Sequence, residues 1–181
     1  MKFYNLNTYY VVTKIKEHQQ NKMNLLSLMN SLPLSKINTD VDKICKTDWN
    51  LPKETKRDYI DLFISMISPY MDEMAKKMKF NKWNIDNVWF QMYGKNNTHN
   101  WHVHNYANWT NVYYLHLPNK ELKTEIYDVK NENIIDNIKV NEGEIVTFPA
   151  GMLHRSPVNN TDELKAVIAF NSNFDDLALT I

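Results

Sequence analysis

Hydrophobic residues recur at different intervals in the two halves of the chain. Over residues 15–29, and again from Lys53 onward, they follow three- and four-residue steps, the spacing of an amphipathic helix. In the second stretch these positions are Tyr59, Leu62, Phe63, Met66, Ile67, Tyr70, Met71 and Met74. Pro52 fits the start of this helix, because the first helical turn does not need the N–H that proline lacks. Ser68-Pro69 predicts a kink or a break into two helices.

From residue 84 onward the pattern changes to short runs rich in β-branched and aromatic residues, separated by turn-forming residues such as Pro118-Asn119 and Asn141 through Gly143. The predicted strands are Asn87–Tyr93, Trp101–Asn105, Thr110–Leu117, Thr124–Val129, Ile134–Val140, Glu144–Phe148 and Ala166–Asn171. Strands at this spacing, with no helices between them, predict an antiparallel sandwich or barrel.

The composition fits one domain and argues against several classes of function. A chain of 181 residues suits a single core. The 21 basic residues balance 21 acidic ones, so no net field favours nucleic acid or an anionic membrane surface. No apolar run reaches the roughly 20 residues of a membrane span, and residues 1–12 do not resemble a signal peptide. With Cys45 as its single cysteine the chain forms no internal disulfide, and we expect a cytoplasmic protein.

Candidate chemistry is concentrated in the histidines. Three of the six lie in the segment His99 through His104. If this segment is a strand, His102 and His104 point to the same face and form a two-point metal chelate. His154, which follows a Phe-Pro-Ala-Gly turn, is the best candidate for a third ligand. An isolated pair of this kind is as often exposed or hydrogen-bonded as metal-bound, but the distant His154 segment favours a metal site.

The order of these motifs resembles the iron(II)- and 2-oxoglutarate-dependent oxygenases, most of all a small branch found in marine phages and bacteria. Sequences of that branch carry Trp, then HxH, VYYL, a G…FP…H segment, and a basic residue before a strand that ends in FN. The corresponding pieces are Trp89 through Tyr93, His99 through His104, Val112 through Leu115, Glu142 through Pro149, His154, and Lys165 through Asn171. The resemblance implies a mainly β, α+β fold: one domain over 1–181, with a helical layer over 1–83 and a double-stranded β-helix (jelly-roll, cupin-like) barrel over 84–175.

The resemblance also implies a chemistry. His102 and His154 would bind Fe(II), and His104 would occupy a position that is Asp or Glu in most of the superfamily. Three neutral imidazoles leave more positive charge on the metal than two imidazoles and a carboxylate do. The co-substrates would be 2-oxoglutarate and O2, and a C–H bond of the substrate would be hydroxylated with release of succinate and CO2. No residue beyond the metal ligands is expected to act in catalysis.

The distal carboxylate of 2-oxoglutarate meets an arginine in most of the superfamily, but the matching residue here is Lys165. Lysine offers a point charge in place of a bidentate fork. Arg155, one of only two arginines, ranks below it because it adjoins His154 and so faces the opposite side of a strand. Tyr114 matches a position whose hydroxyl helps to hold the same carboxylate. Tyr93 and Asn171 align with strands that line the pocket.

Two other functions stay open. Gly143 through His154 fits the second cupin motif, which allows a three-histidine metalloprotein that does not use 2-oxoglutarate. A jelly-roll binding module without catalysis is the other, although a structural metal site would normally include cysteines. The substrate is a small molecule or a peptide, and the sequence names neither it nor the oligomeric state. No nucleic acid or membrane partner is predicted.

Overall fold

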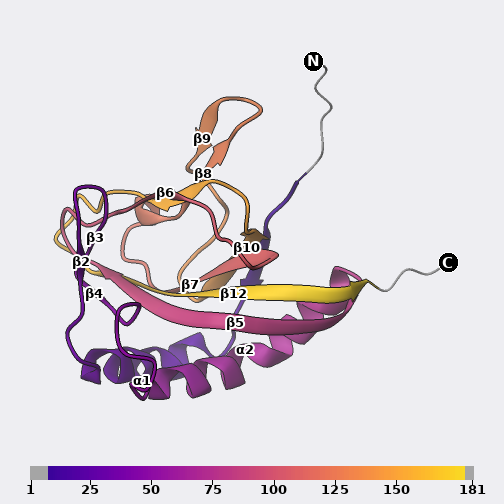
Figure 1. The fold of residues 1–181 in the computed structure, drawn as a ribbon, viewed down its shortest axis with the longest axis horizontal. Coiled ribbons are helices and arrows are strands. Elements are labelled where there is room, and N and C mark those ends of the chain that lie inside the picture. Colours follow the sequence, from indigo (N-terminus) through magenta and orange to yellow (C-terminus); the bar gives the residue numbers. More distant parts are fainter. Residues whose placement is uncertain (1–7, 178–181) are drawn as a thin grey trace.

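The computed structural model describes residues 8–177, which form two antiparallel β-sheets and two helices (Figure 1). The large sheet contains six strands in the order β1 (Val11–Lys14), β10 (Glu144–Pro149), β7 (Trp109–His116), β12 (Lys165–Leu177), β5 (Phe80–Tyr93) and β4 (Lys46–Thr47). The small sheet has the order β6 (His99–His102), β11 (His154–Ser156), β8 (Glu125–Asp128) and β9 (Asn133–Ile135). A further hairpin pairs β2 (Ile37–Asn38) with β3 (Lys43–Ile44), and a short 3-10 turn spans Lys120–Leu122.

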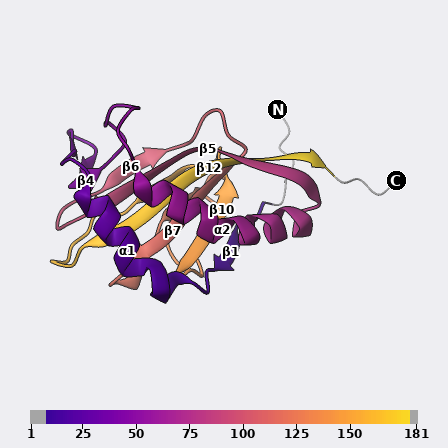
Figure 2. The same ribbon diagram turned by 90° about the horizontal axis from the view of Figure 1, so that it is seen from below.

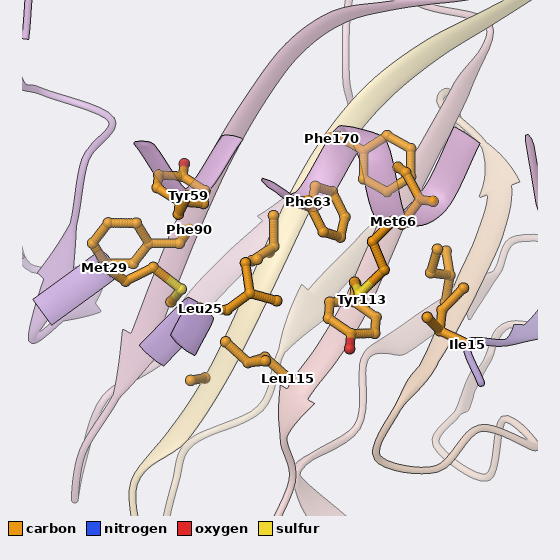
Figure 3. Close-up of a cluster of buried hydrophobic side chains, with 14 of the residues drawn as sticks. Ile15, Leu25, Met29, Tyr59, Phe63, Met66, Phe90, Tyr113, Leu115 and Phe170 are labelled. Carbon is orange, nitrogen blue, oxygen red and sulfur yellow. The ribbon is translucent and has the colours of Figure 1, made fainter. Parts of the chain in front are cut away.

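The two helices cover one face of the large sheet, and the small sheet lies over its other face (Figures 1 and 2). Helices α1 (His18–Ser31) and α2 (Asp58–Lys77) pack their apolar sides on β5, β7 and β12. Figure 3 shows part of this core, in which Phe63 of α2 lies against Tyr113 and Phe170 of the sheet. Most of the Met and aromatic stripe of α2 is therefore core, as its helical spacing predicts.

Alternation along the strands sends neighbouring residues to opposite faces of the large sheet. On β7, Tyr113 belongs to the core under the helices, whereas Tyr114 belongs to a second core between the two sheets. On β5, Met92 belongs to the core under the helices and Tyr93 to the core between the two sheets. The site described below lies on the second of these faces.

Several local predictions are wrong. Helix α2 begins at Asp58 and not near Pro52, and it continues through Pro69 without a break. A proline inside a helix removes one backbone hydrogen bond, and the buried apolar side of α2 outweighs that loss. The strand expected over Ile134–Val140 ends at Ile135, after which Ile138 and Val140 are buried without strand pairing.

The N-terminal third is less helical than predicted. It also contributes β1 to one edge of the large sheet and β4 to the other, and β5 begins at Phe80, inside the range expected to be helical. Such two- to four-residue strands carry no periodicity of their own, because their backbone pairing is decided by the sheet they join. Neither helix of the described residues is long and apolar enough to cross a membrane.

Candidate metal and co-substrate site

Three histidines from different segments converge between the two sheets. One ligand atom from each of His102, His104 and His154 lies within 4.8 Å of the other two. His102 ends β6 and His154 begins β11, and the two residues face each other in the pairing of these strands. Their ring centroids are 4.3 Å apart. The structure thus brings together the three residues that the sequence selected as candidate ligands.

His104 reaches this group from a loop and not from a strand. The strand expected over Trp101–Asn105 ends at His102, so face alternation does not set the position of His104. Instead its backbone N–H donates to the carbonyl of Ala150 at 2.9 Å, which ties the loop to the turn before β11. The His104 ring then lies 5.1 Å from that of His154 and 5.6 Å from that of Trp89.

Each of the three imidazoles holds an oxygen acceptor at Nδ1. The acceptors are the Asn100 carbonyl for His102 (2.6 Å), Oδ1 of Asn171 for His104 (2.6 Å) and the Met152 carbonyl for His154 (2.8 Å). An oxygen at this position requires the proton on Nδ1, which leaves a free lone pair on Nε2. All three rings therefore offer Nε2 as a metal ligand, with the oriented second contact that metal-binding histidines usually have.

Burial also keeps these rings neutral. It lowers the pKa of His102 and His104, and it lowers that of His154 to about 3, where the neighbouring His102 adds to the effect. Neutral imidazole is the form that binds a metal. Three neutral nitrogens that occupy one side of a site suit a divalent transition ion such as Fe(II) or Zn(II) and leave positions open for other ligands.

Lys165 is buried in the same cavity. Its side chain is among the largest fully buried ones, with 2% of the residue exposed. Nζ donates to Oγ of Ser156 at 2.7 Å and lies 4.9 Å from the centre of the Tyr93 ring. Burial lowers the pKa of Lys165 to about 7, and no carboxylate of the described residues lies within 4 Å of its ammonium group. A buried cation without a counter-ion is costly unless an anion joins it.

Tyr93 lines this cavity as predicted, and Tyr114, predicted to help hold the carboxylate, lies next to Lys165 behind the cavity wall; both hydroxyls are engaged in hydrogen bonds. Tyr114 donates to Oγ1 of Thr124 at 2.8 Å and accepts from the backbone N–H of Thr124 at 2.9 Å. Tyr93 donates to Oε1 of Gln91 at 2.9 Å. Burial raises the pKa of Tyr114 to about 12 and raises that of Tyr93 further, so both phenols stay protonated.

The remaining predicted residues lie at different places. Arg155 also lines the cavity, but it donates to Glu125 at 2.6 Å and stacks over the Trp101 ring, so its charge is already paired. Asn171 accepts from His104 and so supports a candidate ligand, a role that the sequence did not predict. Gln91 and Ser156 could not be predicted from the sequence, because a buried polar residue in a strand carries no signal until its partners are known.

An open cleft of about 210 Å³ reaches the histidine group from outside. Its lining consists of Trp49, Asn87, Trp89, His102, Val103, His104, Asn105 and Asn171. Trp49 is half exposed and meets Trp89 edge to face, with ring centroids 5.2 Å apart. Apart from the histidines, this lining contains no ionisable side chain, and a neutral part of a molecule can enter next to His104.

Comparisons with known proteins agree with this geometry. Residues 87–171 match the model of a family described as "Putative 2OG-Fe(II) oxygenase". This segment includes the three histidines and Lys165. No curated protein matches the chain.

Among solved structures, similar folds occur in three enzymes from different sources. A viral collagen prolyl hydroxylase from Paramecium Bursaria Chlorella virus-1, in a 2OG complex, has a TM-score of 0.58 and 16% identity, over 91% of this chain and 94% of that one. An oxidoreductase of the 2OG-Fe(II) oxygenase family from Burkholderia pseudomallei has a TM-score of 0.68 and 9% identity, over 95% and 88%. HygX from Streptomyces hygroscopicus, with nickel and 2-oxoglutarate bound, has a TM-score of 0.63 and 10% identity, over 91% and 82%. These likenesses confirm the predicted double-stranded β-helix, although its sheets do not close into a barrel.

Proposed function

We propose that this chain, whose residues 87–171 match the 2OG-Fe(II) oxygenase model, is an iron(II)- and 2-oxoglutarate-dependent dioxygenase that hydroxylates a C–H bond of a small-molecule or peptidyl substrate. The reaction consumes O2 and 2-oxoglutarate and releases succinate and CO2. His102, His104 and His154 hold Fe(II), and Lys165 binds the distal carboxylate of 2-oxoglutarate.

One observation carries this proposal: a buried ammonium group lines the same cavity as three imidazoles whose Nε2 lone pairs are free. A metal site alone does not need Lys165. An anion that spans the cavity, with one end at the metal and a carboxylate at the other, accounts for both features. The charge-assisted contact with Lys165 is worth about 1.5 to 3 kcal/mol.

The residues of this chain position the reactants and exclude water. The acceptors at Nδ1 fix the three imidazole rings, whose Nε2 atoms would hold the metal. When bound, Fe(II) with 2-oxoglutarate supplies the oxidising power for the C–H bond. Tyr93 and Tyr114 close the wall around Lys165, whose ammonium lies over both rings. The cleft next to His104 is the route by which the substrate reaches the metal.

The lining of the cleft restricts the class of substrate. The cleft is aromatic and uncharged near the metal, which favours a neutral group at the carbon that reacts. The prolyl hydroxylase among the similar folds acts on a peptide substrate, and a peptidyl substrate fits an open cleft as well as a small molecule does.

The test is the turnover of 2-oxoglutarate without added substrate. Purified protein with Fe(II), ascorbate and O2 should convert 2-oxoglutarate slowly to succinate, as measured by chromatography. Lys165→Met removes the ammonium group but keeps an apolar side chain of similar length, and it should reduce succinate formation by at least tenfold at low 2-oxoglutarate concentration.

Succinate formation that does not depend on Fe(II) or on Lys165 would contradict the proposal. A protein that binds metal but has no affinity for 2-oxoglutarate would favour the three-histidine cupin metalloprotein. A protein that binds neither would be a jelly-roll binding module.

A further inference from the structure

A fourth histidine, His99, lies beside the three candidate ligands. Its ring stacks on that of His102, with the centroids 3.9 Å apart and the planes 24° from parallel. It lines the same cavity as His102, His154 and Lys165. Its nitrogen atoms do not belong to the group within 4.8 Å that the other three form.

The hydrogen bonds of His99 differ from those of its neighbours. Nδ1 of His99 is 3.2 Å from Nε2 of Gln91, whose amide oxygen accepts from the Tyr93 hydroxyl. An amide nitrogen is only a donor, so Nδ1 of His99 must accept. A ring that accepts at Nδ1 carries its proton on Nε2.

These hydrogen bonds run in one direction. The Tyr93 hydroxyl donates to Gln91, and the Gln91 amide donates to Nδ1 of His99. Each group passes its hydrogen onward, and the last N–H, at Nε2 of His99, has no acceptor among residues 8–177. Elsewhere on the wall of the same cavity, the Lys165 ammonium donates to Ser156.

Nε2 of His99 is not fully buried, because among the described side chains only Trp89 has a fully buried nitrogen without a partner. The three candidate ligands direct their own N–H groups away, toward Asn100, Asn171 and Met152. They offer lone pairs to the cavity, whereas His99 offers a hydrogen.

We propose that His99 is a hydrogen-bond donor to the metal-chelating end of 2-oxoglutarate, and not a fourth metal ligand. This inference rests on the proposed function. The co-substrate carries charge at both ends, and Lys165 serves the distal carboxylate. The His99 ring stacks on that of His102 and lines the same cavity, so its N–H is near the candidate ligands, where a carboxylate oxygen of the chelate needs a donor. The chain through Gln91 keeps that hydrogen in place.

The first test measures the tautomer itself. Long-range ¹H–¹⁵N correlation spectra of the metal-free protein report which imidazole nitrogen carries the proton, and the spectrum of His99→Phe assigns the His99 signals. We expect Nε2–H at His99 and Nδ1–H at His102, His104 and His154. An Nδ1–H tautomer at His99 would overturn the inference, whatever the protein does with 2-oxoglutarate.

The second test measures affinity for 2-oxoglutarate by calorimetry on protein loaded with Mn(II), which binds without turnover. His99→Phe keeps an aromatic ring on His102 but removes the donor, and it should weaken 2-oxoglutarate binding about ten- to a hundredfold with Mn(II) affinity unchanged. His99→Gln places an amide N–H near the lost Nε2 and should recover part of the affinity.

Gln91→Met tests the same hydrogen without touching the His99 ring. It should let His99 exchange between tautomers and weaken 2-oxoglutarate binding by a smaller factor. Equal affinity in the parent and in His99→Phe contradicts the role of His99 alone. Absence of 2-oxoglutarate binding in the parent contradicts the proposed function.

Discussion

Lys165 donates to Ser156 across 2.7 Å in the interior of the protein, at the wall of the cavity that the three candidate metal ligands also line. Ser156 is two residues beyond His154 on β11, so the cation and a candidate metal ligand are held by one strand. The side chains at these two positions point to the same face of β11.

The affinity for 2-oxoglutarate should fall as the pH rises above neutrality. Burial lowers the pKa of Lys165 to about 7, so the side chain is charged below pH 7 and neutral above it. A dicarboxylate prefers the charged form, and binding must then take up one proton. We expect the Kd of the Mn(II)-loaded protein to rise about tenfold per pH unit above pH 7 in calorimetric titrations.

The matched control is Lys165→Arg, because arginine stays charged throughout this range. Its 2-oxoglutarate affinity should be nearly independent of pH between 7 and 9. The same pH dependence in both proteins would show that another group titrates.

Metal binding should depend on His154 and not on histidines elsewhere. His154→Ala removes one of three ligands and should reduce bound metal from one equivalent to well below one after dialysis, as measured by elemental analysis. His116, whose Nδ1 is 3.1 Å from Glu142 and which lies outside the group, provides the control. His116→Ala should retain one equivalent, and equal metal content in the two variants would exclude the proposed ligand set.

The wall of the cleft depends on a buried carboxylate. Asp48 accepts from the Phe90 backbone N–H at 2.9 Å, from the Tyr59 hydroxyl at 2.6 Å and from Arg57 at 3.1 Å, and it adjoins Trp49 in the chain. Asp48→Ala leaves these donors buried and unpaired, and should lower the free energy of unfolding by about 3 to 5 kcal/mol. Urea denaturation measures this loss.

Asp40→Ala is the control for that measurement, because Asp40 is exposed and makes no side-chain contact among those described. It should change the free energy of unfolding by less than about 0.5 kcal/mol. A loss at Asp48 no larger than at Asp40 would show that the buried contacts do not stabilise this loop.

The turn before β10 requires glycine at position 143 for two reasons. Its φ is +80°, and a Cβ built there would lie 2.8 Å from Cγ of His18, whose ring is itself held by Tyr113. Gly143→Ala should therefore lower the free energy of unfolding by more than about 1 kcal/mol. Gly151→Ala, where a Cβ meets nothing within 4 Å, is the control and should have little effect. Thermal melts of the two variants measure the difference.

The sequence predicted which residues come together better than it predicted the local structure around them. His102, His154 and Lys165 were identifiable because their order along the chain matches a family. The position of His104 came out correctly for the wrong reason: the loop is placed by its bond to Ala150 and not by strand alternation.

What the sequence could not supply is the set of hydrogen-bond partners that fix the tautomer of each ring. Asn171 and Gln91 lie on long strands, and only the fold shows that one of them meets His104 and the other His99. The same limit applies to Arg155, whose pairing with Glu125 depends on the register of β11 and β8. Hydrogen-bond networks between distant segments arise from tertiary packing, and no local pattern encodes them.

The central claim is that three imidazoles hold Fe(II) and that 2-oxoglutarate binds this Fe(II) in the same cavity. Anaerobic addition of 2-oxoglutarate to the Fe(II)-loaded protein tests it most directly, through the visible charge-transfer absorption of an Fe(II)–2-oxo acid chelate. We expect a band in the parent protein that saturates at one equivalent of Fe(II). The band should be lost in His154→Ala, and in Lys165→Met it should need a higher 2-oxoglutarate concentration. No band in the parent protein, or an unchanged band in His154→Ala, would contradict it.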